Sequence, residues 1–382
     1  MKVLLLDSVP LSFGGGFERF LSGLAQYLAI HGHDVTIGTP PDRWARYMYK
    51  ALSGQSIQDC PQQTQHLMET IQVVEMSPSA VRSLAEIYDV AYCKNEPHEL
   101  LFAKVALRNR RCRLIVGLHT APPPIADGRR RDMRSRVYFS APYRQLFARN
   151  VDAVHVLQVA SRQFVQSALR VSTSRVRLIP NGVDIDSFVP AKSDPGPPFT
   201  ALFVGRLDRH KGADLLAASA RLLEGSTDVP IQLLVAGDGP LREQLDTDAH
   251  LSCVRTLGYV ANTAELYHRA HVVLSPSRRE THALVPAEAM ASGLPVVVTD
   301  IPASSCYIAG GAIPVPAGDA NALANAVTVL AREWVSKREE YRERCQQARA
   351  YAEREFNVMV QYKELLKLFE EVSTSSESSA DR

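Results

Sequence analysis

Short apolar strands alternate with helices along this chain of 382 residues, and the alternation starts afresh after residue 198. In the first half we expect strands near residues 2–7, 34–38, 71–76, 89–93, 114–118 and 151–157. In the second half we expect them near residues 200–204, 231–236, 254–257, 271–274 and 294–299. Buried strands separated by helices are typical of parallel sheets with right-handed crossovers. The sequence therefore predicts an α/β chain with two tandem, doubly wound, Rossmann-like domains.

The segment 190–198, PAKSDPGPP, is the best candidate for a linker, because Pro and Gly interrupt both helices and strands. We therefore place an N-terminal domain at 1–189 and a C-terminal domain at 199–350. A helix is expected over 351–371. The polar composition of 372–382 is typical of a disordered tail.

Composition excludes several classes of protein. Charged residues make up 22% and hydrophobic residues 46% of the chain, as in ordinary globular proteins. The six cysteines are scattered without a CxxC pair, which argues against a zinc site or a disulfide framework and favours a reducing compartment. No apolar run is long enough for a membrane span, and the start lacks a signal-peptide pattern. These features predict a cytoplasmic protein.

Arginines cluster in the first half, although the net charge of the whole chain is only +2. The basic run consists of Arg129, Arg130, Arg131, Arg134 and Arg136, with Arg108, Arg110, Arg111 and Arg113 shortly before it. One interpretation is a face for an anionic membrane or an acceptor phosphate, with the protein peripheral at the inner face of a membrane. The alternative is a solvated helix face. The run lacks interleaved aromatic residues and a nucleic-acid module, so no nucleic-acid partner is expected.

Two features of the first half suit ligand binding. Gly14, Gly15 and Gly16 follow the first strand and precede an amphipathic helix, an arrangement that presents free N–H groups to an anion. The alternative is a simple tight turn. His119 follows the strand near 114–118, where an imidazole can reach a ligand and exchange a proton. The alternative is a histidine bonded to loop backbone.

Two cations follow the first strand of the second half. Arg206 comes after the strand that ends at Gly205, and Lys211 stands beside Gly212 at the opening of the next helix. Two cations next to a helix N-terminus would clamp a diphosphate better than either alone. The alternative is a pair of solvent-exposed cations.

Two glutamates flank the start of a helix further on. Glu280 lies on the loop after the strand near 271–274, and Pro286 and Gly293 suit the first turn and the end of a helix, which puts Glu288 on its opening turn. Both carboxylates then lie at the carboxyl edge of the sheet, where α/β proteins bind ligands. Ionised carboxylates accept several hydrogen bonds, as sugar hydroxyls require. The alternative is one exposed glutamate and one favoured by the helix dipole.

Together, these stretches resemble the GT-B glycosyltransferases of family 4. The resemblance rests on IPNGVD, VGRLDRHKG, GDGP, LGYV and the two glutamates followed by AMASGLPVV, in this order, and on the glycine turn and GHDVTI near the start. It spans nearly the whole chain. It implies the GT-B fold, with two Rossmann-like domains facing across a cleft and a C-terminal helix that returns to the N-terminal domain.

The resemblance also implies roles. Arg206 and Lys211 would hold the diphosphate of a nucleotide-sugar donor, Glu288 the ribose hydroxyls, and Glu280 would face the transferred sugar. The implied catalytic residues are His119, Arg206, Lys211 and Glu280. The implied donor-binding residues are Gly15, Gly16, Arg206, Lys211, Glu280, Leu284, Val285 and Glu288. Family members retain the anomeric configuration and generally need no metal or other cofactor.

One departure bears on the donor. After the first glutamate the family usually has a glycine-containing, aromatic-bearing turn, and here Thr281, His282 and Ala283 stand in its place. The expected acceptor is a sugar, a lipid-linked compound or a small molecule. Alternatives are another GT-B enzyme, such as a nucleotide-sugar epimerase, and a non-catalytic nucleotide-sugar-binding protein.

Overall fold

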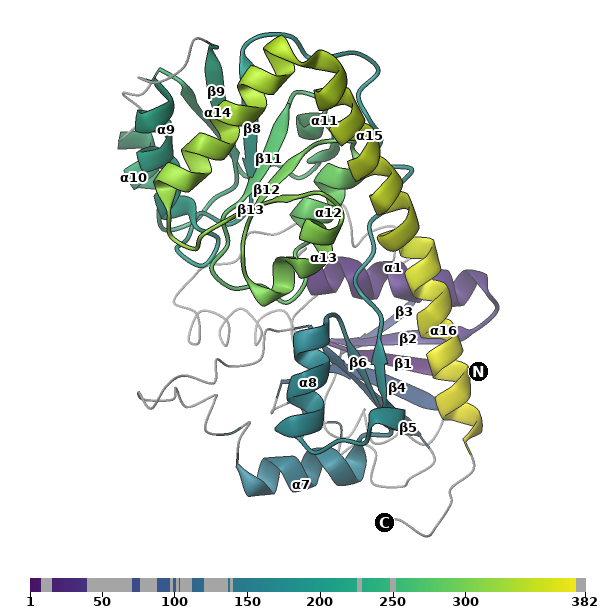
Figure 1. Cartoon of the computed structure of the whole chain (residues 1–382). Helices are drawn as coiled ribbons and strands as arrows, with labels where there is room; N and C mark the ends of the chain where they lie inside the picture. Colours follow the sequence, from purple (N-terminus) through teal and green to yellow (C-terminus); the bar gives the residue numbers. More distant parts are fainter. Residues whose placement is uncertain are drawn as a thin grey trace. The chain divides into compact units, whose positions relative to one another are not determined.

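The structure is a computed structural model of the whole chain (Figure 1). It describes residues 1–7, 16–39, 71–75, 88–96, 99–100, 103, 112–119, 137, 140–224, 229–247 and 252–375. The chain divides into two compact units. The first contains Met1–Pro180 and Tyr362–Arg382, and the second contains Asn181–Gln361.

The first unit contains a seven-stranded parallel sheet in the order β3-β2-β1-β4-β5-β6-β7. Its strands are β1 (Lys2–Leu6), β2 (Asp34–Thr39), β3 (Gln72–Glu75), β4 (Val90–Lys94), β5 (Arg113–Leu118), β6 (Ala153–Val156) and β7 (Val176–Leu178). Its described helices are α1 (Gly16–Ile30), α7 (Ala141–Asn150), α8 (Val159–Ser167) and, from Tyr362 onward, α16 (Val358–Thr374), with a 3₁₀ turn at Thr173–Arg175. The strands predicted for this half are present.

Helices cover both faces of this sheet because alternate strand residues point to opposite sides. Phe147 of α7 and Val165 of α8 belong to one core. On the other face, Phe369 of α16 stacks on Tyr92 of β4 with ring centroids 5.8 Å apart, and the ring of Phe20 of α1 lies 6.1 Å from Tyr92. The C-terminal helix therefore packs on the N-terminal sheet, as predicted.

The second unit repeats the architecture with a six-stranded parallel sheet in the order β10-β9-β8-β11-β12-β13. Its strands are β8 (Phe199–Val204), β9 (Ile231–Ala236), β10 (Val254–Gly258), β11 (Val272–Ser275), β12 (Val296–Thr299) and β13 (Ile313–Val315). Its helices are α9 (Leu216–Glu224), α10 (Arg242–Thr247), α11 (Ala264–Tyr267), α12 (Leu284–Ala291), α13 (Ser305–Ala309), α14 (Ala320–Ser336) and α15 (Arg338–Glu355), with 3₁₀ turns at Ala213–Leu215 and Pro302–Ser304.

Two apolar cores lie on the two faces of this sheet. Phe203 of β8 packs with residues of α9 and α14, whereas its neighbour Leu202 packs with residues of α12 and α15. In Figure 1 α14 and α15 follow one another along the chain and pass from one side of the sheet to the other. The fold class is therefore α/β with two tandem Rossmann-like domains.

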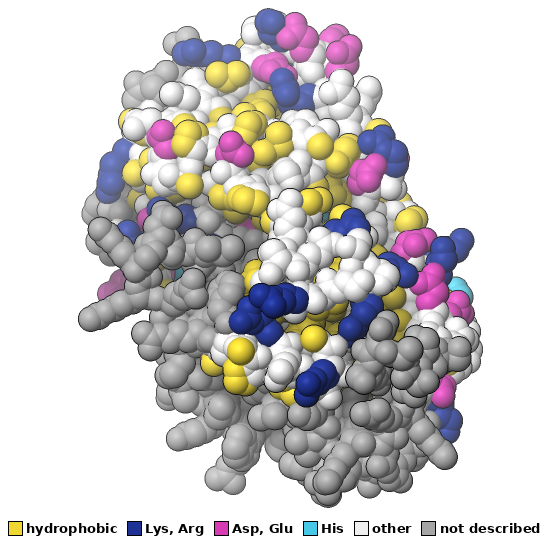
Figure 2. All heavy atoms as spheres, turned by 60° about the horizontal axis from the view of Figure 1, so that its bottom comes forward, with side chains coloured by type: hydrophobic (Ala, Val, Ile, Leu, Met, Phe, Trp, Pro, Cys, Tyr) yellow, Lys and Arg dark blue, Asp and Glu magenta, His cyan; other side chains and the backbone are white. Residues whose placement is uncertain are grey.

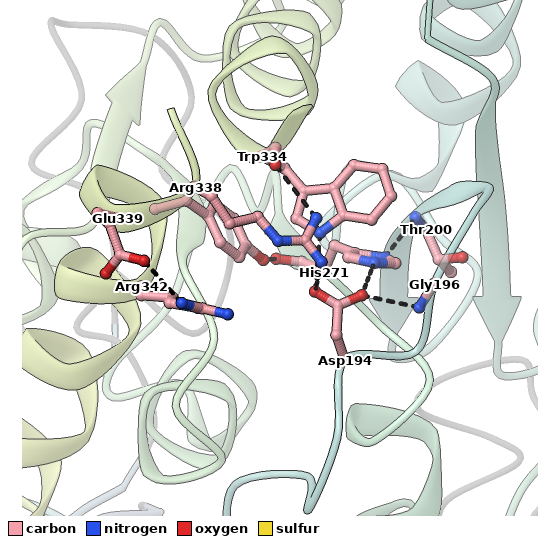
Figure 3. A network of polar contacts seen from close by, with 9 residues as sticks. Asp194, Gly196, Thr200, His271, Trp334, Arg338, Glu339 and Arg342 are labelled. Carbon is pink, nitrogen blue, oxygen red and sulfur yellow. Dashed lines mark hydrogen bonds and ion pairs between the residues drawn. The ribbon is translucent and has the colours of Figure 1, made fainter. Parts of the chain in front are cut away.

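The segment 190–198 belongs to the second unit, and the division between units falls earlier, after Pro180. The carboxylate of Asp194 accepts hydrogen bonds from Trp334 Nε1 at 2.9 Å and Arg338 Nη2 at 2.8 Å (Figure 3). The buried imidazole of His271 lies 3.6 Å from the same carboxylate. The Pro-rich segment is thus pinned to α14, α15 and the start of β11, and composition alone does not show this.

The end of the chain also differs from the expectation. The helix expected over 351–371 is two helices, α15 and α16, separated at Phe356 and Asn357. Helix α16 continues to Thr374, into the segment with the composition of a tail, whereas residues 376–382 lie outside the described part. Within the described parts of the chain, none of the helices combines the length and the apolar content needed to cross a bilayer.

Candidate active site

The loop after β8 carries the two predicted cations. Arg206 forms an ion pair with Asp208, and the other oxygen of Asp208 accepts a hydrogen bond from the Lys211 backbone N–H at 2.9 Å. Burial alone would raise the pKa of Asp208, but the Lys211 amide and the Arg206 guanidinium outweigh burial and hold this pKa below its ordinary value. Asp208 therefore stays ionised, pairs with the Arg206 guanidinium and holds the backbone of Lys211 in the loop.

Lys211 also contacts the second loop. Its Nζ lies 2.6 Å from Glu280 Oε1, and the side chain of Glu280 is only 15% exposed. Arg278, from the same loop as Glu280, donates to the Arg209 carbonyl oxygen at 2.7 Å and to Asp214 at 2.6 Å. The loops after β8 and β11 are thus tied together by side chains from both.

Gly212 makes this approach possible. Its φ is +73°, in the left-handed region, and a Cβ built on it would lie 2.1 Å from the Pro276 carbonyl oxygen. Glycine adopts this conformation without penalty and leaves room for the neighbouring backbone. The local sequence Lys211–Gly212 therefore follows from the packing of one loop against the other.

Glu288 lies on α12, but it is not on the opening turn. The helix starts at Leu284 and Val285, so Glu288 is one turn further along, and the prediction of its place was wrong by that turn. Pro286 does occupy the first turn, as predicted. Glu288 is 6% exposed, and its Oε2 accepts a hydrogen bond from Tyr267 Oη at 2.6 Å. Its carboxylate is thus held in place.

The unusual turn before α12 is buried. His282 is 7% exposed, and its Nδ1 lies 3.2 Å from Tyr307 Oη, which also donates to the Ala283 carbonyl oxygen at 2.6 Å. Since the phenol has one proton, His282 Nδ1–H is the donor of the longer contact. Burial lowers the pKa of His282 to about 4, so the ring is neutral at pH 7. The buried His282 side chain and its contact with Tyr307 therefore help to fix the conformation of this turn.

In the first unit, His119 follows β5 as predicted. Its Nε2 lies 2.7 Å from Tyr92 Oη, and its ring lies 4.6 Å from those of Phe17 and Phe20. Gly16 is the first residue of α1. Gly14 and Gly15 lie outside the described residues.

A buried charge cluster that was not predicted from the sequence lies at the carboxyl edge of this sheet. Lys94 Nζ lies 2.8 Å from Asp7, 3.8 Å from Glu18 and 3.9 Å from Glu99, and it sits 4.3 Å above the centre of the Phe17 ring. The lysine side chain is only 8% exposed. A lysine that closes a buried strand is the one sequence signal of this cluster, which fixes the start of α1 and the ends of β1 and β4.

The basic run was a predicted contact surface, and Arg129, Arg130, Arg131, Arg134 and Arg136 all lie outside the described residues, as do Arg108, Arg110 and Arg111. Arg113 is described and donates to Asp152 Oδ1 at 3.3 Å. Figure 2 shows Lys and Arg side chains in dark blue beside the grey atoms of residues that are not described. The surface role of the run stays a prediction.

The second unit thus brings Arg206, Lys211, Glu280 and Glu288 to loops and a helix at the carboxyl edge of one parallel sheet, and the first unit places His119 and Gly16 at the corresponding edge of the other. Cations and carboxylates at one sheet edge are chemically suited to an anionic, hydroxyl-bearing ligand. Fold and site together define the class as a two-domain α/β protein with a Rossmann-like sheet in each unit and polar side chains at the carboxyl edge of each sheet.

Comparison with known proteins gives the family. Residues 14–187 match the model of Glycosyltransferase Family 4, and residues 198–333 match that of Glycosyl transferases group 1. Together the two matches account for most of the chain. The chain belongs to the family 4 glycosyltransferases of group 1.

Two relatives illustrate the similarity. The phosphatidyl-myo-inositol mannosyltransferase of Mycobacterium leprae is 38% identical over 52% of this chain and 54% of its own length, so that match spans about half of the relative. The protein of the same name from Mycobacterium tuberculosis (strain H37Rv) is 27% identical over 98% of both chains.

Solved structures share the fold. HepE of Anabaena, in complex with UDP and glucose, superposes with a TM-score of 0.73 at 19% identity and covers 97% of this chain and 99% of its own. A glycosyltransferase of Rickettsia africae gives a TM-score of 0.77 at 15% identity, with 98% and 99% covered. At these identities the likeness shows the GT-B fold.

Proposed function

We propose that this protein is a retaining, metal-independent glycosyltransferase that moves a sugar from a nucleotide-diphosphate sugar to an acceptor hydroxyl. The observation that carries the proposal is the contact between Lys211 and Glu280 at 2.6 Å, beside Arg206, on loops at the carboxyl edge of one sheet. It puts a diphosphate-binding cation next to a carboxylate suited to sugar hydroxyls.

The leaving group decides the chemistry. Breaking the sugar–phosphate bond leaves negative charge on the diphosphate, and preorganised cations stabilise such charge in the transition state. Lys211 has three N–H donors and Arg206 has five, so each can hold its present carboxylate and an incoming phosphate oxygen as well. The first-turn amides of α12, at Leu284 and Val285, point the same way as the helix dipole and favour an anion. Two fixed cations make a metal ion unnecessary for this task.

Retention requires that the acceptor attacks the anomeric carbon from the same side as the leaving phosphate. Glu280 is engaged by Lys211, so we assign it to sugar hydroxyls and not to nucleophilic attack. The acceptor oxygen bonds to the anomeric carbon as the sugar–phosphate bond breaks, and the acceptor proton passes to the leaving phosphate oxygen. Attack from the side of the leaving group preserves the configuration. We assign His119 of the first unit to hydrogen bonding with a substrate hydroxyl.

Relatives support a class of substrates. HepE binds UDP in its solved complex, and relatives are named as mannosyltransferases of phosphatidyl-myo-inositol and as a D-inositol 3-phosphate glycosyltransferase. We accordingly propose a nucleoside-diphosphate hexose as donor and a lipid-linked or small polyhydroxylated acceptor. A lipid acceptor would place the protein in the cytoplasm with peripheral contact to the inner face of a membrane.

The first experiment is a thermal-shift screen over UDP-, GDP- and ADP-sugars, because a ligand that binds only the folded protein raises the apparent melting temperature. The donor that stabilises the protein is then incubated with an acceptor panel in EDTA, and the anomeric configuration of the product is read by NMR. Transfer with retention supports the proposal. Inversion, dependence on added metal, conversion of the donor without an acceptor, or binding without turnover over the whole panel would each overturn part of it. Co-sedimentation with anionic vesicles tests the membrane contact.

A further inference from the structure

Three polar rings form a chain across neighbouring strands of the first sheet. Tyr92 lies on β4, His119 follows β5 and His155 lies on β6. Tyr92 Oη lies 2.7 Å from His119 Nε2 and 2.7 Å from His155 Nδ1. The other nitrogen of His155, Nε2, lies 2.7 Å from the Ile179 carbonyl oxygen. One phenol thus bridges two imidazoles, and the second imidazole ends on backbone.

Gly117 opens the path for this bridge. A Cβ built on Gly117 would lie 1.9 Å from Tyr92 Oη and 2.8 Å from His119 Cδ2. Any side chain there would occupy the position of the phenol oxygen. Gly117 therefore lets the Tyr92 side chain on β4 extend past β5 to His155 on β6.

The direction of each hydrogen bond follows from the carbonyl at the end. A carbonyl oxygen only accepts, so His155 Nε2 carries a proton. Burial lowers the pKa of His155 to about 4, so the ring is neutral at pH 7 and its Nδ1 is an acceptor. Tyr92 must then donate to His155, and burial raises the pKa of Tyr92, which keeps it a phenol. A phenol that has donated its one proton can only accept from His119, so His119 Nε2 is the donor.

We propose that Tyr92 and His155 are positioning residues that hold His119 as the Nε2–H tautomer, in which Nδ1 carries no proton and acts as a hydrogen-bond acceptor. The ring nitrogen that a histidine presents is set by the bond its other nitrogen makes. The role in the reaction rests on the proposed function, whereas the tautomer itself does not. The other tautomer would turn Nδ1 from an acceptor into a donor.

Tautomers are read directly from ring nitrogen shifts. Protein labelled with [15N]histidine is measured by long-range 1H–15N NMR at pH 7.5, and His119 and His155 are assigned from the spectra of the variants His119→Gln and His155→Phe. We expect protonated Nε2 on both rings. In His155→Phe the Tyr92 phenol loses its acceptor and donates to His119 instead, so the proton of His119 should move to Nδ1. In Tyr92→Phe the single tautomer should give way to a mixture. Protonated Nδ1 on His119 in the unmodified protein, or an unchanged His119 in both variants, would overturn the proposal without any substrate.

Activity supplies the second readout. With the donor found in the screen, Tyr92→Phe should lower kcat about tenfold, the factor given by the loss of one hydrogen bond worth about 1.4 kcal/mol in the transition state, and change KM by less than about twofold. Tyr88→Phe is the matched control, because Tyr88 is also a buried tyrosine of this unit whose hydroxyl contacts one side chain, Thr36. Equal losses of kcat in the two variants, with an unchanged His119 NMR signal, would show that the contacts of Tyr92 with His119 and His155 are only structural.

Discussion

The ammonium of Lys211 lies 2.6 Å from a carboxylate oxygen of Glu280, although the two residues are 69 positions apart. They meet because β8 and β11 are adjacent parallel strands whose following loops emerge at the same edge of the sheet. The cation that we propose for the phosphate and the carboxylate that we propose for the sugar thus form an ion pair, and we expect a change at either residue to affect how both parts of a donor are bound.

Replacing Lys211 by alanine should slow turnover by about tenfold or more, because one charge-stabilising group on the leaving diphosphate is lost. Steady-state kinetics with the stabilising donor measure the effect. Lys337→Ala serves as control, since the Lys337 side chain is 59% exposed and pairs with Glu340 at the surface. Unchanged turnover in the Lys211 variant would remove this residue from the diphosphate site.

Gly212→Ala should impair both folding and turnover. The new Cβ would meet the Pro276 carbonyl oxygen and push apart the loops that hold Lys211 and Glu280. Gly32→Ala is a matched control, because Gly32 has a similar φ of +80° and open space around it. That control carries only the backbone strain, about 1 kcal/mol. Urea unfolding and kinetics on both variants separate strain from collision, and equal losses in the two would count against the tight loop contact.

Lys94→Met should lower the free energy of unfolding by about 3–5 kcal/mol, since it removes a cation that pairs with three buried carboxylates. Its partners, Asp7 first, raise the pKa of Lys94 against the opposing effect of burial. A raised lysine pKa contributes stability that is fully present at neutral pH and is lost only above the ordinary lysine range. Lys2→Met, at a side chain that is 50% exposed, should change stability by less than about 1 kcal/mol. Similar losses of unfolding free energy in both variants would show that the three carboxylates do not depend on the charge of Lys94 for stability.

His282→Phe should make the protein less sensitive to acid. The folded-state pKa of His282 is lowered to about 4, below the ordinary 6.5, so the unfolded chain binds a proton between these values and the folded chain does not. Its contribution is present above pH 6.5 and is lost as the pH falls toward 4, about 2 kcal/mol by pH 5. Urea unfolding from pH 7.5 to 4.5 should therefore show a shallower decline for the variant. His210→Phe, at an exposed loop position, should follow the unmodified protein. Parallel curves for His282→Phe would mean that this histidine titrates normally.

The two sheets could be predicted because parallel strands are buried on both faces and are therefore continuously apolar. The short edge strands β7 and β13, with three residues each, leave too little pattern. The segment around Asp194 was misread because its partners, Trp334 and Arg338, lie far away in the sequence and only packing brings them near.

The candidate residues of the second unit were found because motif spacing after a strand translates directly into position at a sheet edge. Asp208 was missed, although an aspartate three residues before an amide that needs an acceptor is a recognisable turn signal. The links of His119 to Tyr92 and His155 have no such signal, since they run across strands and depend on an atom-sized gap beside Gly117.

That gap has an evolutionary consequence. The hydroxyl of Tyr92 fills the volume that a methyl group at position 117 would take, so the two sites compete for the same space. Relatives that acquire alanine in place of Gly117 should also have exchanged the tyrosine for a shorter or non-hydroxylated residue, and those that keep the tyrosine should keep the glycine. Positions 92 and 117 should therefore covary among relatives.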